Sequence, residues 1–449
     1  ADLYPYLVLT AYFTDPGLYR GRMLEMLRNE VRFTTREDAV PADLDLETGK
    51  LGPPSLFGAG EYAKDGLVSI TELLGRTPWY VRMIDMIDAA MERAPVHTRY
   101  GKLPAADPEL NGDFLQVLVR LAAMTGEARY WEWSRRIGDW YVHDVLPANH
   151  GLPGERVRLR DHGNEIIAGL VLLYALEQQH ATSRAAALRP VIARMLDRVL
   201  ASANEHGMLY DEIDAATLKP TRATLSDNWG YVYAAMYAFY QATGDEKYRT
   251  AVRRVLANLP HYRNHTWEAM PGSKPGSFDG YADSIESALY LYNREPVAAA
   301  LAWIESEIGV MASMQQPSGH IENWYGEGNF NRTMLLWALF NSAGVTASDW
   351  HPGVRVGAVV AGDRLTFSLE APANWRGRLR FDYARHHRIF QFAKNYARLN
   401  EFPEWFTVDE NALYELNQRT YLGSELVSGV RVEPGMYSVE QIRRPFRSP

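Results

Sequence analysis

The chain has 449 residues, of which 47% are hydrophobic, 12% aromatic and 23% charged, with a formal net charge of -8 and no cysteine. This composition excludes an intrinsically disordered chain, and the length allows one large domain and a smaller one. The absence of cysteine excludes thiolate zinc sites, iron–sulfur clusters, thiol nucleophiles and disulfides. The mild acidity argues against a nucleic-acid partner. No apolar run reaches the roughly 20 residues that cross a bilayer, so we expect no membrane partner either.

The first predicted element is a helix over residues 4–13, close behind an N-terminus that begins at Ala1 rather than at methionine. We interpret this start as a processed or trimmed end, so a targeting segment would not be visible in the sequence. The compartment therefore stays open, with the periplasm or secretion favoured, and the oligomeric state stays open as well.

Seven short turns recur along the chain. Four of them are rich in Gly, Pro or Asp and end on an aromatic residue, and three, at residues 181–183, 293–296 and 342–344, are degenerate versions. The Thr-Gly-Asp-x-x-Tyr pattern of residues 243–248 is the clearest example. Gly or Pro ends one helix, and Asp or Glu favours the start of the next, so each turn joins a helical hairpin. A spacing of roughly fifty residues is typical of stacked hairpins. The other turns lie at residues 14–19, 75–80, 125–130, 181–183, 293–296 and 342–344.

The predicted helices alternate between two kinds. A helix that is apolar on every side must be buried, whereas a helix charged on one side, such as residues 249–259, lies outside. This alternation predicts an α/α toroid of six or seven hairpins. We expect a closed ring rather than an open solenoid because the inner helices are wholly apolar. These inner helices span residues 114–124, 166–176, 231–240, 285–292 and 334–340.

The pattern changes to strands in the last part of the chain. Residues 354–360 and 365–369 flank a tight turn, residues 379–383 alternate with period two, and residues 427–439 indicate another strand pair. We therefore predict a toroid domain over residues 1–348 and a small antiparallel β module over residues 349–449.

Polar and aromatic residues gather just before the predicted inner helices. Since the inner helices of a toroid run parallel, these clusters are expected to meet at one mouth of the ring. Carboxylates and amides that bond hydroxyls, together with aromatic rings, are typical of a saccharide site. The clusters lie at residues 60–65, 109–113, 160–165, 226–231, 277–283 and 320–332.

Carboxylates in these clusters are the candidate catalytic groups. Asp161 and Glu165 are four residues apart and share a helix face, as do Asp279 and Asp283. Like charges in a buried mouth push their pKa values apart, which suits general acid and base work. A hydrolase needs two carboxyls, so we expect Asp161 or Glu165 to act with Asp227 or Asp283. The simpler alternatives are helix capping, or neutralisation by Arg160 or Arg332.

The same clusters also fit other roles. Lyases and epimerases remove the proton beside a uronate carboxylate, using Tyr or His while Asn or Arg neutralises the acid. The residues available for that chemistry are His162, Asn164, Asn228, Tyr231, Tyr325 and Arg332. Histidines beside a carboxylate could instead shuttle protons, as with His162 beside Asp161 or His320 beside Glu322. The aromatic residues expected to stack on a substrate are Trp229, Trp324 and Tyr325, the last two in a Gly-rich loop over residues 322–331.

The alternating helices, the Thr-Gly-Asp-x-x-Tyr turns and the trailing β module resemble the α/α-toroid carbohydrate-active enzymes. These include glycoside hydrolases such as the unsaturated glucuronyl hydrolases, toroid polysaccharide lyases and uronyl epimerases. The resemblance implies a cleft at one mouth of the barrel and sugar chemistry there. It assigns no single family.

We therefore predict a glycoside hydrolase that cleaves a uronic-acid-containing oligo- or polysaccharide. A polysaccharide lyase or uronyl epimerase is one alternative, and a non-catalytic glycan-binding toroid is another. We predict no cofactor and no metal among the site residues, although calcium held by aspartate and backbone oxygens stays open. The sequence leaves the sugar, the linkage and exo or endo action undetermined.

Overall fold

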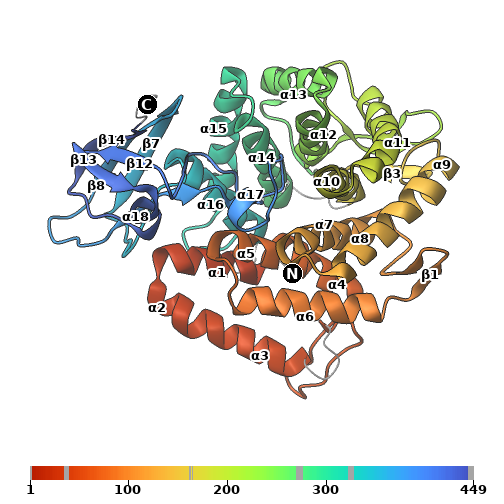
Figure 1. Ribbon diagram of the computed structural model, residues 1–449, viewed down its shortest axis with the longest axis horizontal. Helices are drawn as coiled ribbons and strands as arrows, with labels where there is room; N and C mark the ends of the chain where they lie inside the picture. Colours follow the sequence, from red (N-terminus) through yellow and green to blue (C-terminus); the bar gives the residue numbers. More distant parts are fainter. Residues whose placement is uncertain are drawn as a thin grey trace, which may run out of the picture.

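The structure is a computed structural model that describes residues 3–34, 40–160, 163, 165–268, 277–321 and 328–442. Figure 1 shows a large helical part and, at the left of the view, a small β-rich part formed by C-terminal residues. This outline agrees with the predicted order of a helical domain and a β module. The number of hairpins and the boundary at residue 348 stay predictions.

The inner helices pack side by side in chain order, and they close into a ring. Each contacts the next, the last contacts α1, and α1 contacts η2 and α5. Most residues of α7, α10, α12 and α14 are buried, as their largely apolar sequences predict. The inner helices are α1 (Leu3–Thr14), α4 (Leu56–Glu61) with η2 (Tyr62–Leu67) and α5 (Val68–Leu74), α7 (Pro108–Thr125), α10 (Glu165–His180), α12 (Trp229–Thr243), α14 (Phe278–Tyr292) and α16 (Gly328–Asn341).

The outer helices bury only one face against this ring. In α13, for example, Tyr248, Val252 and Val255 are buried while the charged residues lie outside. The outer helices are α2 (Pro16–Leu18) with η1 (Tyr19–Met23) and α3 (Leu24–Thr34), α6 (Pro78–Glu92), α8 (Ala128–Trp140) with η3 (Tyr141–Val145) and α9 (Leu146–Ala148), α11 (Thr182–Ala201), α13 (Glu246–Asn258) with η5 (Leu259–Tyr262), and α15 (Ala298–Ser313).

The predicted hairpin turns form as their sequences indicate. Gly126 and Gly244 end α7 and α12 in the left-handed region, with φ of 72° and 77°, where a side chain would be strained. Asp245 then accepts a hydrogen bond from the Lys247 backbone N–H at the start of α13. The closing Tyr248 is buried, and its hydroxyl donates to Asp197 at 2.8 Å. The aromatic residue therefore packs back across the corner and fixes one hairpin against the next.

The β module has its own core. Its sheet follows the order β13-β12-β14-β8-β7, and Leu365, Phe367 and Val439 are buried within it. The predicted strand pair over residues 427–439 is wrong in its first half, because residues 427 and 428 end α18 (Gly423–Ser428). The strands are β7 (Arg355–Ala361), β8 (Arg364–Glu370), β12 (Leu413–Leu416), β13 (Arg419–Leu422) and β14 (Gly435–Gln441), with the short β6 (Thr346–Ala347), β9 (Leu379–Arg380), β10 (Asp382–Tyr383) and β11 (Thr407–Val408) beside them.

Two small antiparallel sheets lie in the loops of the helical part, and neither was predicted. One pairs β1 (Val96–Thr98) with β2 (Gly101–Leu103). The other has the order β3-β4-β5 and joins β3 (Arg156–Arg158), β4 (Tyr210–Asp214) and β5 (Pro220–Leu225). Since β3 precedes α10 and β5 precedes α12, this second sheet stands beside the mouth, the end of the ring at which the inner helices begin.

Residues 385–404, which we call the plug, leave the β module and lie across the opposite end of the ring. They begin with α17 (Arg385–Arg388), and Phe390, Leu399 and Phe402 join the core of the helical domain. Arg120 of α7 donates to the backbone oxygens of Leu399 and Arg398 at 3.0 and 2.9 Å. The plug therefore closes the end of the ring at which the inner helices end.

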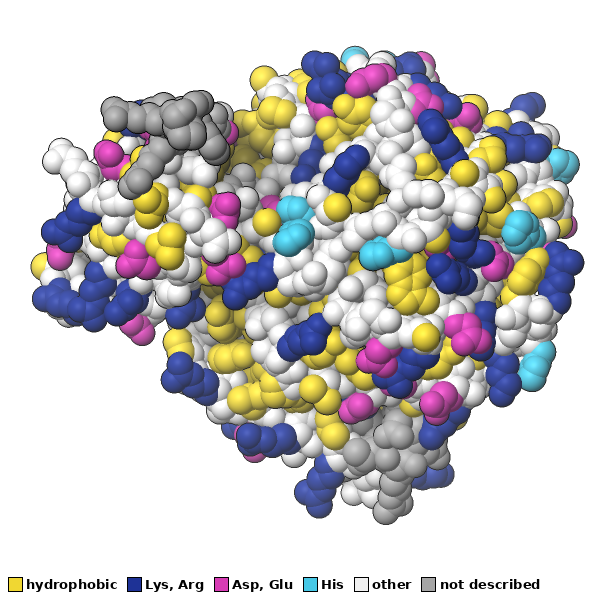
Figure 2. Space-filling model, viewed as in Figure 1, with side chains coloured by type: hydrophobic (Ala, Val, Ile, Leu, Met, Phe, Trp, Pro, Cys, Tyr) yellow, Lys and Arg dark blue, Asp and Glu magenta, His cyan; other side chains and the backbone are white. Residues whose placement is uncertain are grey.

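The surface carries charges of both signs. Figure 2 shows Lys and Arg side chains interspersed with Asp and Glu side chains on the face drawn, without the basic stripe of a nucleic-acid binder. None of the helices in the described part of the chain combines the length and the apolar character that a membrane span requires.

Candidate active site

Asp227 stands at the mouth, directly before α12. Its Oδ1 accepts the backbone N–H of Asn228 at 2.9 Å. The neighbouring Ser226 fixes this segment to the β3-β4-β5 sheet region, because its N–H donates to the Leu209 oxygen at 3.0 Å and its hydroxyl donates to the Leu159 oxygen at 2.5 Å. Ser226 thus anchors the segment that carries Asp227.

The environment of Asp227 favours its protonated form. Its exposed fraction is 4%, and burial raises the pKa of this carboxyl group to about 8, with further increases from the negative charges of Asp283 and Glu268. This raised pKa favours the protonated form of Asp227, which is the form that a general acid needs.

Asp283 lies near Asp227 but has a different set of partners. Arg332 of α16 donates to Asp283 Oδ1 at 2.6 Å and also pairs with Glu286. The hydroxyl of Tyr231 donates to Glu286 Oε2 at 2.7 Å and lies 3.3 Å from Asp283 Oδ1. The mouth thus holds one carboxyl group, Asp227, whose pKa is raised, and a second, Asp283, that is paired with a buried guanidinium group.

Glu165 is the first residue of α10 and is fully buried. Its Oε1 accepts from the Lys64 ammonium at 2.9 Å, and its Oε2 accepts from the Gln116 amide. The plug contributes Arg398, whose Nη1 lies 3.7 Å from Glu165 Oε1. The guanidinium carbon of Arg398 also lies 3.3 Å from the centre of the Tyr231 ring. The plug therefore places a cation directly beneath the residues of the mouth.

The other site residues predicted from the sequence have different surroundings, and some of them lie outside the described residues. Trp229 is fully buried and donates to the Ser284 hydroxyl at 2.9 Å, and Asn228 is fully buried beside it. Asp279 accepts a hydrogen bond from Asn329 at the start of α16. His320 is half-buried, and its backbone oxygen accepts from Gln316. Outside the described residues lie Asp161, His162, Asn164, Glu322, Trp324 and Tyr325.

Several residues of the site were not predicted from the sequence. Lys64 belongs to a predicted cluster but carried no assigned role, and Glu268 follows a helix rather than preceding one. Arg398 comes from the predicted β module, so no local pattern in the sequence places it inside the ring. The spacing in the sequence groups Glu286 with Asp279 and Asp283 in one carboxylate cluster, but it assigns Glu286 no role of its own.

A cavity of about 320 Å³ lies beside the mouth, on the β3-β4-β5 sheet. Asp211 links it to the site, because this carboxylate is also one of the charges that raise the pKa of Asp227. Guanidinium groups bind carboxylates in a bidentate geometry, so such a lining suits an acidic ligand. The cavity is lined by Arg158, Arg160, Asp211, Glu212 and Arg222. Within the described ranges, no group of three or more His, Asp or Glu residues could hold a metal ion.

No family model matches the sequence, and no curated protein matches it either. Solved structures similar to this chain include an unsaturated glucuronyl hydrolase from Bacillus sp. GL1, with a TM-score of 0.48 and 11% identity over 69% of this chain and 94% of that chain. An inactive variant of an α-1,6-mannanase from Salegentibacter sp. HEL1_6, in complex with mannotetrose, has a TM-score of 0.46 and 12% identity over 69% and 96% of the two chains.

A family 76 glycoside hydrolase from a bovine Bacteroides thetaiotaomicron strain has a TM-score of 0.43 and 12% identity over 70% of this chain and 76% of that chain. The chain is thus similar in structure to glycoside hydrolases of more than one family, and no single family is assigned.

Proposed function

We propose that the protein is a glycoside hydrolase whose reaction takes place at the mouth of the ring. The observation that carries this proposal is the contrast between Asp227 and Asp283. Burial and neighbouring carboxylates raise the pKa of Asp227 to about 8, whereas Asp283 holds an ion pair with Arg332 at 2.6 Å. Two carboxyls whose surroundings push them toward opposite protonation states are what glycoside hydrolysis requires.

Asp227 acts as the general acid in this proposal. It donates its proton to the leaving glycosidic oxygen as the bond to the anomeric carbon breaks. Asp283 then stabilises the positive charge that develops on the sugar and, as the base or nucleophile, completes the substitution with water. Arg332 and Tyr231 orient Asp283 and Glu286, since both donate hydrogen bonds to this pair. Asp161 remains a proposed candidate for the second carboxyl.

We propose buried supporting roles for three of the predicted residues. Glu165 contacts Lys64 of η2, Gln116 of α7 and Arg398 of the plug. Its proposed role is therefore to hold these segments together inside the ring. Trp229 and Tyr231 have exposed fractions of 0% and 2%, so we assign them to positioning the carboxylates.

A uronate is the proposed substrate class. The cavity beside the mouth presents Arg158, Arg160 and Arg222 next to Asp211, and a guanidinium group can pair with the carboxylate of a uronic acid. Elimination is the less suitable reaction for the described residues. Burial raises the pKa of Tyr231 well above its usual value, so its hydroxyl is a poor base.

The test is a screen of the purified protein against neutral and uronate-containing oligosaccharides. New reducing ends and the ultraviolet absorbance of a new double bond are followed together. We expect reducing ends without new absorbance, and loss of this activity in Asp227→Asn. The matched control is Asp144→Asn, which changes a half-buried surface aspartate paired with Arg99. Absorbance that rises in step with reducing ends would contradict hydrolysis.

A further inference from the structure

A second, larger cavity lies at the other end of the ring, between the helical domain and the β module. It has a volume of about 850 Å³, which is within the range of small-molecule sites, and such sites favour boundaries between domains. Leu74 at the end of α5 and Leu339 near the end of α16 belong to its lining. It is therefore distinct from the mouth, where Asp227 and Asp283 lie at the beginning of inner helices.

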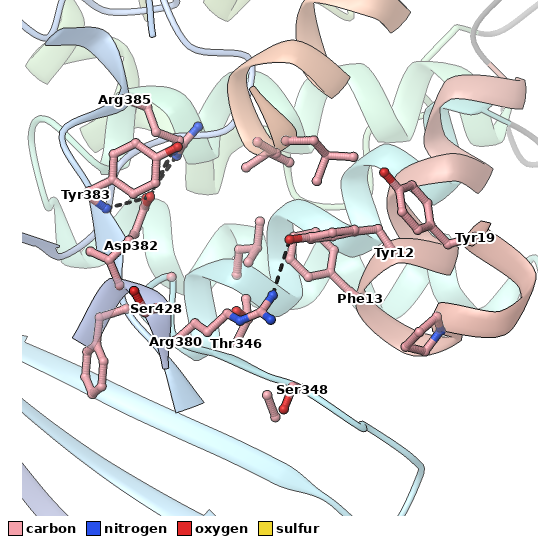
Figure 3. A pocket seen from close by; sticks show the side chains of 18 of the residues that line it. Tyr12, Phe13, Tyr19, Thr346, Ser348, Arg380, Asp382, Tyr383, Arg385 and Ser428 are labelled. Atoms are coloured by element: carbon pink, nitrogen blue, oxygen red, sulfur yellow. Dashed lines mark hydrogen bonds and ion pairs between the residues drawn. The ribbon is translucent and has the colours of Figure 1, made fainter. Parts of the chain in front are cut away.

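One wall of this cavity is aromatic and held in place by the core. Figure 3 shows Tyr12, Phe13 and Tyr19 together on one side of the cavity. The Tyr12 ring meets both other rings edge to face, with centroids 5.2 Å apart. Tyr19 in turn stacks at 5.6 Å on Trp79, which is fully buried. Aromatic rings anchored in this way offer preformed faces on which a sugar ring can pack.

The opposite wall supplies a guanidinium group that is available to a ligand. Arg380 of β9 is exposed and donates to the Tyr12 hydroxyl at 3.3 Å, as Figure 3 shows. Neither Arg380 nor Arg20, which also lines the cavity, forms an ion pair with a carboxylate of the described residues. These two cationic side chains therefore line the cavity and have N–H donors that no ion pair with a carboxylate of the described residues occupies.

The carboxylates that line the cavity do not neutralise these arginines. Asp382 is bound in a fork by Arg385, with Nε to Oδ1 and Nη2 to Oδ2 both at 3.1 Å. Asp349, the other carboxylate of the lining, is exposed to solvent. Hydroxyl groups that can bond a sugar come from Thr346, Ser348 and Ser428. The lining thus combines aromatic rings, hydroxyls and a guanidinium group with unused donors.

We propose that this cavity is a second binding site, for an acidic saccharide. The sugar ring packs against Tyr12 and Tyr19, and its carboxylate or sulfate pairs with Arg380. Because the two walls come from different parts of the chain, the site forms only when the β module docks on the ring. The inference goes beyond the proposed hydrolase activity and concerns binding alone.

The proposal is tested by calorimetric titration of the Asp227→Asn protein, in which we expect turnover to be slow. The probes are a uronate-containing disaccharide, a sulfated disaccharide and a neutral disaccharide. We expect the acidic probes to bind at a site that Arg380→Gln weakens by about ten- to a hundred-fold, the loss expected for a hydrogen-bonded charge. Binding of the uronate probe alone identifies a carboxylate ligand, and binding of both acidic probes identifies any anionic sugar.

The matched control is Arg355→Gln, since Arg355 is an exposed arginine of the same β module outside the cavity. It should bind as the parent protein does. Ser428→Trp places a large side chain in the cavity and should abolish the same binding event. Binding of unchanged affinity and stoichiometry in both Arg380→Gln and Ser428→Trp would overturn the proposal. Since this readout needs no turnover, it is independent of whether the mouth hydrolyses glycosides.

Discussion

The two ends of the ring each hold a buried carboxyl group whose pKa is raised to about 8: Glu72 under the plug and Asp227 at the mouth. Burial is the largest cause in both places. The next cause differs in sign, because Arg385 lowers the pKa of Glu72 whereas Asp283 raises the pKa of Asp227. A raised pKa is therefore a weak marker of catalysis, and the charge of the neighbours is a better one.

The plugged end is a network in which charges hold chain segments together. Glu72 accepts from Arg385 at 2.7 Å and from the backbone N–H groups of Glu401 and Phe402 at 2.6 and 2.8 Å. Glu401 also pairs with Arg120 at 3.0 Å. These bonds connect α5, α7 and the plug. At the mouth, by contrast, acidic groups face one another and the β3-β4-β5 sheet adds a cavity lined by arginines.

The largest expected effect comes from removing the proton donor at the mouth. Asp227→Asn should lower kcat by about 10²–10⁴-fold on the best substrate of the screen, the usual contribution of a positioned general acid. The measurement is steady-state kinetics, with Asp144→Asn as the control. Wild-type kcat in Asp227→Asn would remove Asp227 from the mechanism.

Replacing Arg398, the buried cation of the plug, should lower the stability of the fold. Arg398→Met should lower the free energy of unfolding by about 3 kcal/mol or more, because Glu165 and Glu401 lose a buried counter-charge. Denaturant unfolding measures this loss. The control is Arg388→Met, which removes a half-exposed plug arginine paired with Glu410 and should cost about 1 kcal/mol or less. Equal losses in the two variants would show that the plug is not held by its buried charges.

The value of kcat/KM should depend on pH through the loss of the proton from Asp227. Only the protonated form donates, so kcat/KM should fall about tenfold per pH unit above a pH of about 8. A pH–rate profile on the wild-type protein measures this. A rate that declines from pH 4 to 5 upward would place the proton on another group.

The ionisation of Asp227 should also make the free energy of unfolding depend on pH. The raised pKa of Asp227 means that between about pH 4 and 8 the folded chain keeps a proton that the unfolded chain has lost. Folding stability due to this group therefore decreases as pH rises through that window and levels off above it. Asp227→Asn removes the dependence and should stabilise the protein more at pH 8 than at pH 5. Thermal melts at pH 5 and 8 test it, and an equal change at both values would contradict it.

Much of the fold could be predicted because it follows local patterns. The alternating inner and outer helices and the turns at Gly126 and Gly244 depend on periodicity and glycine geometry, which are visible in short windows of sequence. The plug could not be predicted, since Arg398 and Glu401 reach α7 across more than half the chain. The same holds for the pairing of β3 with β4, because α10 and α11 lie between these two strands in the sequence.

The candidate site was predictable in kind but not in its pairing. The position of Asp227 and Asp283 before or early in inner helices was enough to bring them to one end of the ring. Which carboxylate receives Arg332, and which stays protonated, depends on packing between helices that no spacing encodes. For that reason, the sequence suggested several equivalent pairs of carboxylates, and the different neighbours of Asp227 and Asp283 are the basis on which we propose different roles for them.

The most direct test of this account is the protonation state of Asp227 itself. Carbon-13 NMR of protein labelled at the aspartate carboxyls, titrated from pH 3 to 10, would compare the wild type with Asp227→Asn. The account predicts that the resonance absent from Asp227→Asn titrates near pH 8 in the wild type. Titration of that resonance near pH 4 would mean that Asp227 is ionised at neutral pH and would contradict its role as the general acid.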